Sequence, residues 1–144
     1  MVRRSRSGFT LVELLIVVVI LAILAAAIIP TFSDSTADAK ASTALTNLNV
    51  LRGQIQMYRL QHNGLTPSAT LVELTMQTNA EGGEGTDFGP YLLKIPVNPY
   101  TNSSTVRTTS SNPPTAASGQ PDAGWLYHPA SGNIWLDHPD HLTD

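Results

Sequence analysis

The sequence contains no cysteine. That absence excludes a disulfide framework, a thiol nucleophile, a cysteine-ligated metal site and a lipid anchor attached to cysteine. Charged residues are also scarce, because Asp, Glu, Lys and Arg make up 13% of the 144 residues and the net charge is -3. A mildly acidic chain lacks the basic patch that binds phosphates, so we expect no nucleic-acid partner.

A catalytic constellation is absent as well, since no nucleophile, base and orienting acid can be grouped, and we expect no enzymatic activity. The glycine-rich segment 80–87 is acidic and lacks the Lys-Ser or Lys-Thr pair of a phosphate-binding loop. Residue types that ligate metals gather in the C-terminal tail. They are Asp137, His138, Asp140, His141 and Asp144. A polar tail around a proline is more often simply solvated, so we assign no metal site.

The longest feature present is an apolar run from Phe9 to Ile29, in which only Thr10 and Glu13 are polar. About 21 residues of α-helix rise roughly 31 Å, the thickness of the hydrocarbon core of a bilayer. The run therefore predicts a membrane-spanning helix. The arginines of segment 1–8 predict that its N-terminal end stays in the cytoplasm.

Glu13 is the anomaly in this run. A carboxylate there costs at least about 2.5 to 3.5 kcal/mol on insertion scales, and such groups are rare and usually functional. One interpretation places Glu13 at the membrane interface, where it reaches water. The other supplies a cation, because cleavage between Gly8 and Phe9 would create an α-amino group one helical turn before Glu13.

Segment 4–14, RSRSGFTLVEL, resembles the leader and processing site of type IV prepilins and type II secretion pseudopilins. The resemblance implies cleavage after Gly8 by a prepilin peptidase, methylation of the new Phe9 amine by the same enzyme, and assembly into a helical filament. It also implies that Glu13 pairs with the Phe9 amine of a neighbouring subunit. The motif is specific, since a short basic leader, Gly, Phe and this Glu must all precede an uncharged apolar run.

An ordinary secretory signal peptide is the competing interpretation, with segment 25–27, Ala-Ala-Ala, as its cleavage site. Cleavage there would discard the helix and release a secreted enzyme or binding domain. Two features oppose it. Glu13 lies where the signal should be uncharged, and the run exceeds the usual length of about 7 to 15 residues.

Pro30 follows the run and either kinks or ends the helix, because it lacks an N–H and its ring crowds the preceding turn. Beyond it, apolar residues recur at spacings of three and four, which is the pattern of an amphipathic helix. They are Ala41, Ala44, Leu48, Leu51, Ile55 and Tyr58. We predict one helix from about Phe9 to about His62, kinked at Pro30 and stopped by Asn63-Gly64, with this stripe packed on the chain's own sheet.

The remaining residues predict a small globular domain. Segment 70–73, Thr-Leu-Val-Glu, fits a capping box that would begin a short second helix. Segment 88–100 carries three prolines and predicts an extended loop. We expect four apolar residues to hold this loop in place, namely Tyr91, Leu92, Ile95 and Tyr100. Segment 101–124 predicts a long surface loop because it is rich in Ser, Thr, Asn and Pro. Apolar segments 124–128 and 133–137 flank turn residues and predict a β-hairpin that closes the core.

Together these features predict an α+β, pilin-like fold, in which a long N-terminal helix packs on a small C-terminal antiparallel β-sheet. We divide the chain into a leader, residues 1–8, and a transmembrane and filament-core helix, residues 9–30. An amphipathic continuation of the helix follows over residues 31–64, and residues 65–144 form the globular domain.

Within the superfamily, the resemblance favours major type II secretion pseudopilins. Segment 90–102 matches in part a stretch of that family that runs from Pro-Tyr to Asp-Pro-Trp-Gly-Asn, and many adhesive pilins carry a disulfide that this chain lacks. The resemblance implies a structural subunit of a secretion pseudopilus, a single-pass protein of the bacterial inner membrane with its C-terminal domain in the periplasm. Its partners would be further copies of itself, the prepilin peptidase and other secretion or pilus subunits.

The alternative is a type IV pilus subunit for adhesion, motility or DNA uptake, because both classes share the processing motif. Major pseudopilins of type II secretion also bind calcium near their C-terminal strands. Calcium is therefore a candidate cofactor by resemblance, but the tail does not align cleanly and no residue is assigned to it.

Overall fold

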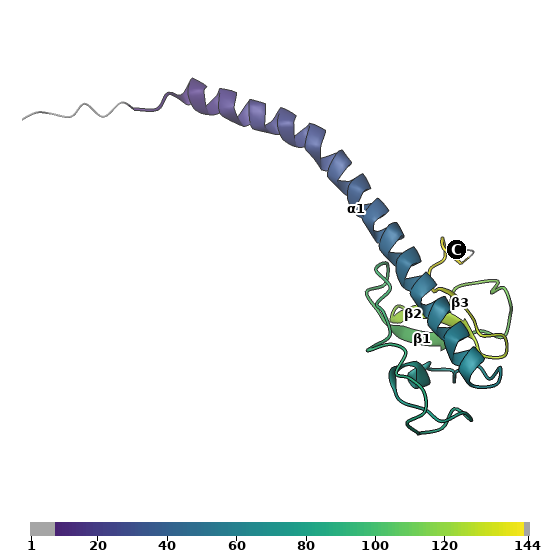
Figure 1. Ribbon diagram of the computed structural model, residues 1–144. Helices are drawn as coiled ribbons and strands as arrows, with labels where there is room; N and C mark the ends of the chain where they lie inside the picture. Colours follow the sequence, from purple (N-terminus) through teal and green to yellow (C-terminus); the bar gives the residue numbers. More distant parts are fainter. Residues whose placement is uncertain (1–7, 143–144) are drawn as a thin grey trace, which may run out of the picture. The chain divides into compact units, whose positions relative to one another are not determined.

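The computed structural model describes residues 8–142, without the side chains of residues 29–34. The chain consists of two compact units, residues 1–39 and 40–144. Helix α1, Leu11–Gln61, has residues in both (Figure 1). The predicted leader lies outside the described residues except for Gly8, and Asp144 also lies outside them.

The first unit contains the apolar part of α1. Leu11–Ile28 is long and apolar enough to cross a membrane, and none of it is buried within the chain. Its large apolar side chains are between 48% exposed, at Val17, and 82% exposed, at Leu11. The helix continues through Pro30 instead of ending there; the kink at this residue stays a prediction.

In the second unit, one face of α1 is buried. The fully buried residues are Ala44, Leu48, Leu51 and Ile55, and Tyr58 is 2% exposed. This confirms the predicted stripe from Ala44 to Tyr58, whereas Ala41 is only partly buried. The helix stops as predicted, because Asn63 and Gly64 adopt positive φ values of 53° and 88°. Their turn allows the Gly64 N–H to donate to the Arg59 carbonyl at 2.8 Å.

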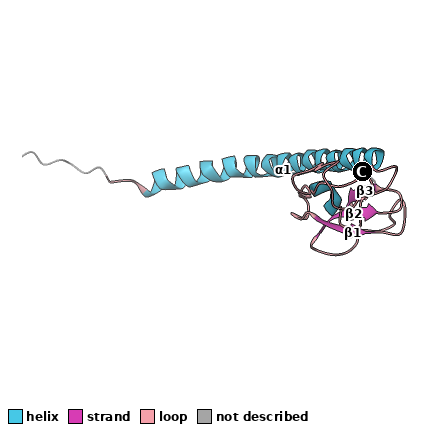
Figure 2. Ribbon diagram, turned by 60° about the horizontal axis from the view of Figure 1, so that its bottom comes forward, coloured by secondary structure: helices cyan, strands magenta, loops and turns pink. Residues whose placement is uncertain are grey.

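Three strands form the sheet in the order β1 (Thr105–Thr108), β2 (Ala123–His128) and β3 (Asn133–Leu136) (Figure 2). Strands β2 and β3 are antiparallel, which confirms the predicted hairpin. Trp125 lies opposite Leu136 and Tyr127 lies opposite Ile134. These four side chains are buried on one face of the sheet, in the same cluster as the stripe of α1.

The prediction of an antiparallel sheet was wrong, because β1 pairs with β2 in parallel and the sheet is mixed. Strand β1 lies inside the segment that was predicted to be all loop. It escaped prediction because it is a polar edge strand in which only Val106 is apolar and partly buried. The long connection over residues 109–122 returns the chain to the same end of the sheet, as a parallel pairing requires.

The predicted capping box at Thr70 was also wrong. The carboxylate of Glu73 instead accepts hydrogen bonds from the Ser68 N–H at 3.1 Å and the Ser68 hydroxyl at 2.8 Å. Leu71 takes the left-handed conformation with φ 57°, and only one 3-10 turn follows, η1 (Val72–Thr75). Burial of Leu71 and Leu74 holds this turn in place.

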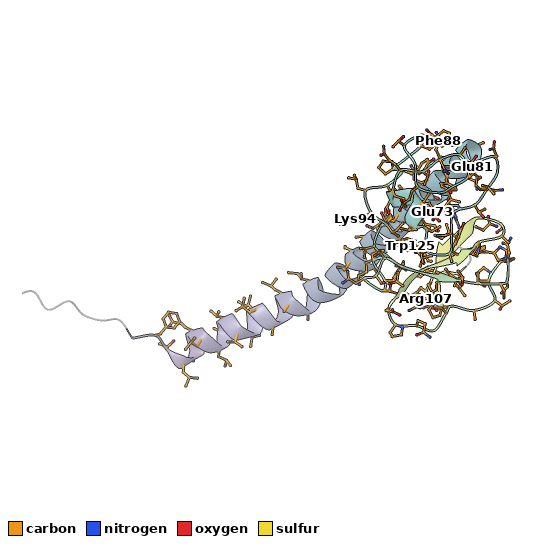
Figure 3. The ribbon with its side chains drawn as sticks, turned by 90° about the horizontal axis from the view of Figure 1, so that it is seen from below. Glu73, Glu81, Phe88, Lys94, Arg107 and Trp125 are labelled. Atoms are coloured by element: carbon orange, nitrogen blue, oxygen red, sulfur yellow. The ribbon has the colours of Figure 1, made fainter. Side chains whose placement is uncertain are left out.

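The proline-rich loop completes the core. Tyr91, Leu92, Ile95 and Tyr100 are partly buried and pack against the cluster, which confirms their predicted role. The indole N–H of Trp125, a residue labelled in Figure 3, donates to the Pro96 carbonyl at 2.8 Å, so the loop is also tied to β2. The sheet therefore has α1 and this loop on its apolar side.

Ile55→Ala should lower the free energy of unfolding of the second unit by about 2 to 5 kcal/mol, because it leaves a cavity in the cluster. Leu60→Ala is the matched control, since Leu60 is 80% exposed on the same helix and should change stability by less than about 0.5 kcal/mol. Denaturation of the full chain in detergent, followed by tryptophan fluorescence, measures both, because the two tryptophans lie in this unit. Equal effects of the two substitutions would contradict the core assignment.

Tyr127 predicts a loss of stability at alkaline pH. Burial raises the pKa of its phenol to about 12, and the hydroxyl donates to the Pro67 carbonyl at 3.1 Å. A raised pKa stabilises the folded state fully below the ordinary value of about 10, and that stabilisation is lost as pH rises towards the folded value.

Tyr127→Phe should cost about 1 kcal/mol at pH 7 through the lost hydrogen bond, and its stability should fall less than that of the wild type between about pH 10 and 12. Urea unfolding across this range measures the difference. An identical pH dependence in both proteins would show that Tyr127 does not carry the effect.

Candidate processing and assembly site

The predicted site residues lie at the beginning of α1 and are exposed. Gly8, Phe9 and Thr10 precede the helix, and Glu13 is in its first turn. Phe9 is 76% exposed. Apart from its chain neighbours, no atom of the described residues lies within 4 Å of the position that a Cβ on Gly8 would occupy. Cleavage there and methylation of Phe9 stay predictions.

Thr10 and Glu13 form a capping box that the sequence analysis missed. The Thr10 N–H donates to Glu13 Oε2 at 2.8 Å, and the Thr10 hydroxyl donates to the same oxygen at 2.7 Å. In return the Glu13 N–H donates to Thr10 Oγ1 at 3.2 Å. The Thr10 carbonyl accepts the first helical bond, from the Leu14 N–H at 3.3 Å. Thr10 is therefore the N-cap residue, and the Thr-x-x-Glu signature could have identified it.

Among the described residues of one chain, Glu13 thus has hydrogen-bond donors but no cation as a partner. Its carboxylate sits over the N-terminus of α1, where unpaired N–H groups and the helix dipole favour a negative charge. Pairing of Glu13 with the Phe9 amine of a neighbouring subunit stays a prediction.

In the described part of the C-terminal tail, the histidines and Asp137 make contacts within the fold. The rings of His138 and His141 pack against Tyr100, with centroid distances of 5.0 and 4.4 Å. Asp137 is buried, and its Oδ1 accepts a hydrogen bond from the Ser118 N–H at 2.7 Å. Between residues 8 and 142 no group of three or more His, Cys, Asp or Glu side chains could hold a metal ion.

Calcium was the cofactor that the family resemblance suggested. It takes six to eight oxygen ligands, usually with several carboxylates among them. Among the described carboxylates of the tail, one oxygen, Asp137 Oδ2, is buried without a hydrogen-bond partner. The described side chains therefore do not fit a calcium site.

His62 is the one histidine in the hydrophobic core, and its contacts are structural. It is fully buried and stacks on Tyr58 with a centroid distance of 3.7 Å. Its Nδ1 lies 2.8 Å from the Tyr58 carbonyl and its Nε2 lies 2.9 Å from Thr78 Oγ1. Because a carbonyl only accepts, we assign the proton to Nδ1 from the hydrogen-bond network. Both ring nitrogens are therefore satisfied by the fold.

Comparison with known proteins places these features in a family. The family described as the prokaryotic N-terminal methylation motif matches residues 3–29. The type II secretion system core protein G of Pseudomonas aeruginosa is 32% identical over 104 residues, which cover 71% of this chain and 73% of that protein. The core protein G of Vibrio cholerae is 32% identical over 101 residues, covering 69% and 68% of the two chains.

Similarity to pilus subunits is shorter. A fimbrial protein of Pseudomonas aeruginosa is 37% identical over 67 residues, which cover 46% of this chain and 44% of that protein. No solved structure matches the chain significantly. The core protein G relatives extend over most of the chain, including sequence far beyond the methylation motif, and the chain accordingly belongs to the type II secretion system core protein G family.

Proposed function

We propose that this chain is a structural, non-enzymatic subunit of a type II secretion pseudopilus, a helical filament that supports protein export. One observation favours a secretion pseudopilus over a type IV pilus. Similarity to core protein G covers 71% of the chain, whereas similarity to the fimbrial protein covers 46%. A type IV pilus subunit for adhesion, motility or DNA uptake is the second candidate, favoured by that shorter match.

The proposed location is the bacterial inner membrane, with the second unit in the periplasm. The exposed apolar segment Leu11–Ile28 supports an anchor, because so large an apolar surface must be covered by lipid or by other helices. The arginines before Gly8 support a cytoplasmic N-terminus.

The proposed mechanism begins with cleavage after Gly8 by a prepilin peptidase and methylation of Phe9. The new amine would then pair with Glu13 of another copy, which gives the carboxylate a countercharge in an apolar environment and sets the register between copies. This retains the four segments of residues 1–8, 9–30, 31–64 and 65–144, with Pro30 as a kink. Other secretion subunits are further proposed partners.

A second surface supports self-association. The face of α1 that points away from the buried stripe is exposed and carries no charge. Its residues are Ser42, Thr46, Asn49, Gly53, Met57 and Leu60. The basic residues nearby, Arg52 and Arg59, donate to carbonyls of Ile134 and Ser131 in their own unit. A helix face turned permanently to water usually carries charged residues, so this face is suited to contact with other subunits.

Gly53 on this face is unexplained by the isolated unit. Apart from its chain neighbours and the adjacent backbone of α1, no described atom lies within 4 Å of the position of a Cβ there, yet glycine inside a helix costs about 0.5 to 1 kcal/mol relative to alanine. A glycine allows another helix to approach closely.

Removal of the gene from its host, with complementation by the wild type, tests the proposed function. We expect the proteins exported by type II secretion to disappear from the medium while surface fibres, twitching and DNA uptake persist. Intact export with lost surface fibres would select the pilus instead.

Gly8→Val should block maturation, because a branched side chain would crowd the bond that the peptidase cuts. The protein should keep its leader, which intact mass of the membrane-extracted chain detects. Gly53→Ala is the control at another open glycine and should mature normally. Normal maturation of Gly8→Val would contradict the proposed cleavage after Gly8.

Glu13→Val should leave membrane insertion intact, because it removes a charge from the apolar run. Filament yield, measured by electron microscopy and by cross-linking of neighbouring copies, should fall to near background. Val12→Leu, a change of similar size at the adjacent position, should assemble normally. Wild-type filaments from Glu13→Val would refute the pairing with Phe9.

A further inference from the structure

The capping box uses the two carboxylate oxygens of Glu13 unequally. Both donors of Thr10, its N–H and its hydroxyl, bond to Oε2 at 2.8 and 2.7 Å. Oε1 accepts no hydrogen bond from the part of the chain that the structure describes. An ionised carboxylate accepts at both oxygens, so Oε1 keeps its full capacity for another donor.

We propose that Thr10 is a positioning residue for assembly, which holds Glu13 through Oε2 and presents Oε1 to the cationic amine of a second copy. This inference rests on the proposed function, because the amine is the processed terminus of Phe9. It adds Thr10 to the proposed assembly site and gives Oε1 and Oε2 of Glu13 different roles. Hydrogen bonds from Thr10 fix the carboxylate, and the second copy supplies the charge.

Three physical consequences favour this arrangement. Before assembly, two donors replace part of the hydration that the carboxylate loses next to lipid. The side chain of Glu13 is already ordered, so pairing loses less rotamer freedom than pairing with a mobile carboxylate would. The bond from the Glu13 N–H to Thr10 Oγ1 also fixes the threonine rotamer, so the hydroxyl proton is directed at Oε2.

Substitution of Thr10 separates these roles. Valine has nearly the same shape as threonine but lacks Oγ1, so Thr10→Val removes the hydroxyl donor and the acceptor for the Glu13 N–H and leaves only the backbone bond to Oε2. Serine restores the hydroxyl without the methyl group. Thr108→Val, at an exposed position of β1, is the matched control for loss of a threonine hydroxyl elsewhere.

The experiment measures incorporation of a tagged full-length variant into filaments of cells that also express the wild type. Incorporation is counted only over tagged chains whose mass shows a start at Phe9, so that a processing defect does not enter the result. We expect Thr10→Val to incorporate about tenfold less than the wild type, in keeping with loss of a charge-assisted hydrogen bond. Thr10→Ser should lie within about twofold of the wild type, and Thr108→Val should match it.

A double substitution distinguishes positioning from simple helix capping. Glutamine at position 13 still completes a capping box but carries no charge. If Thr10 acts through the charge of Glu13, Thr10→Val should cause no further loss in a Glu13→Gln background. If Thr10 only caps the helix, the tenfold loss should recur there, and the proposal is overturned.

Two other results separate this proposal from the proposed function. Normal incorporation of Thr10→Val, or failure of Thr10→Ser to restore incorporation, overturns the role of Thr10. If Glu13→Gln still incorporates poorly in that case, the pairing of Glu13 with the Phe9 amine stands. Normal incorporation of Glu13→Gln overturns that pairing itself. Thr10→Ala, which lacks the branched side chain, repeats the test if Thr10→Val yields too few processed chains to count.

Discussion

A carboxylate cannot remain in an apolar environment without hydrogen-bond donors or a cation, and Glu13 brings that constraint to the beginning of α1. Its own chain supplies the hydrogen-bond donors, because Thr10 donates twice to Oε2. The carboxylate also needs a countercharge, and the described residues place no cation at Oε1. The proposed cleavage would connect membrane anchoring, processing and assembly through this one side chain, because it would create the cation that the carboxylate needs.

In the second unit, α1 supplies one face of the hydrophobic core. Leu48, Leu51 and Ile55 are buried in the same cluster as the inward-facing residues of the β2–β3 hairpin, so one face of the helix is fully used by the fold. The opposite face carries no charge and has Gly53 at its centre. Packing of the fold and the proposed self-association therefore use different faces of the helix.

Sequence periodicity predicted the elements whose burial follows a local repeat. The stripe of α1 repeats every three to four residues, and alternate residues of β2 and β3 face the core, so both could be identified from the chain alone. Strand β1 could not, because an edge strand with Val106 as its one apolar residue has no such repeat. Its parallel pairing depends on the path of residues 109–122, which no local pattern encodes.

The Thr-x-x-Glu signature shows the same limit within one motif, since it occurs at Thr10 and again at Thr70. At Thr10 the capping box forms. At Thr70 the left-handed conformation of Leu71 breaks the helical path, and Ser68 supplies the donors that Glu73 uses instead. The signature names the groups that can pair, but the backbone decides which of them meet. The role of Oε1 could be inferred only once the contacts of Oε2 were known.

The most direct test of the account is the intact mass and N-terminal peptide map of the protein extracted from its native membrane. We expect a chain that starts at Phe9 and carries one added methyl group, because the proposed cation of the filament is that processed amine. A chain that starts near Ile28 would contradict it, since cleavage there would remove Thr10 and Glu13 together with the membrane segment and leave an ordinary secreted domain.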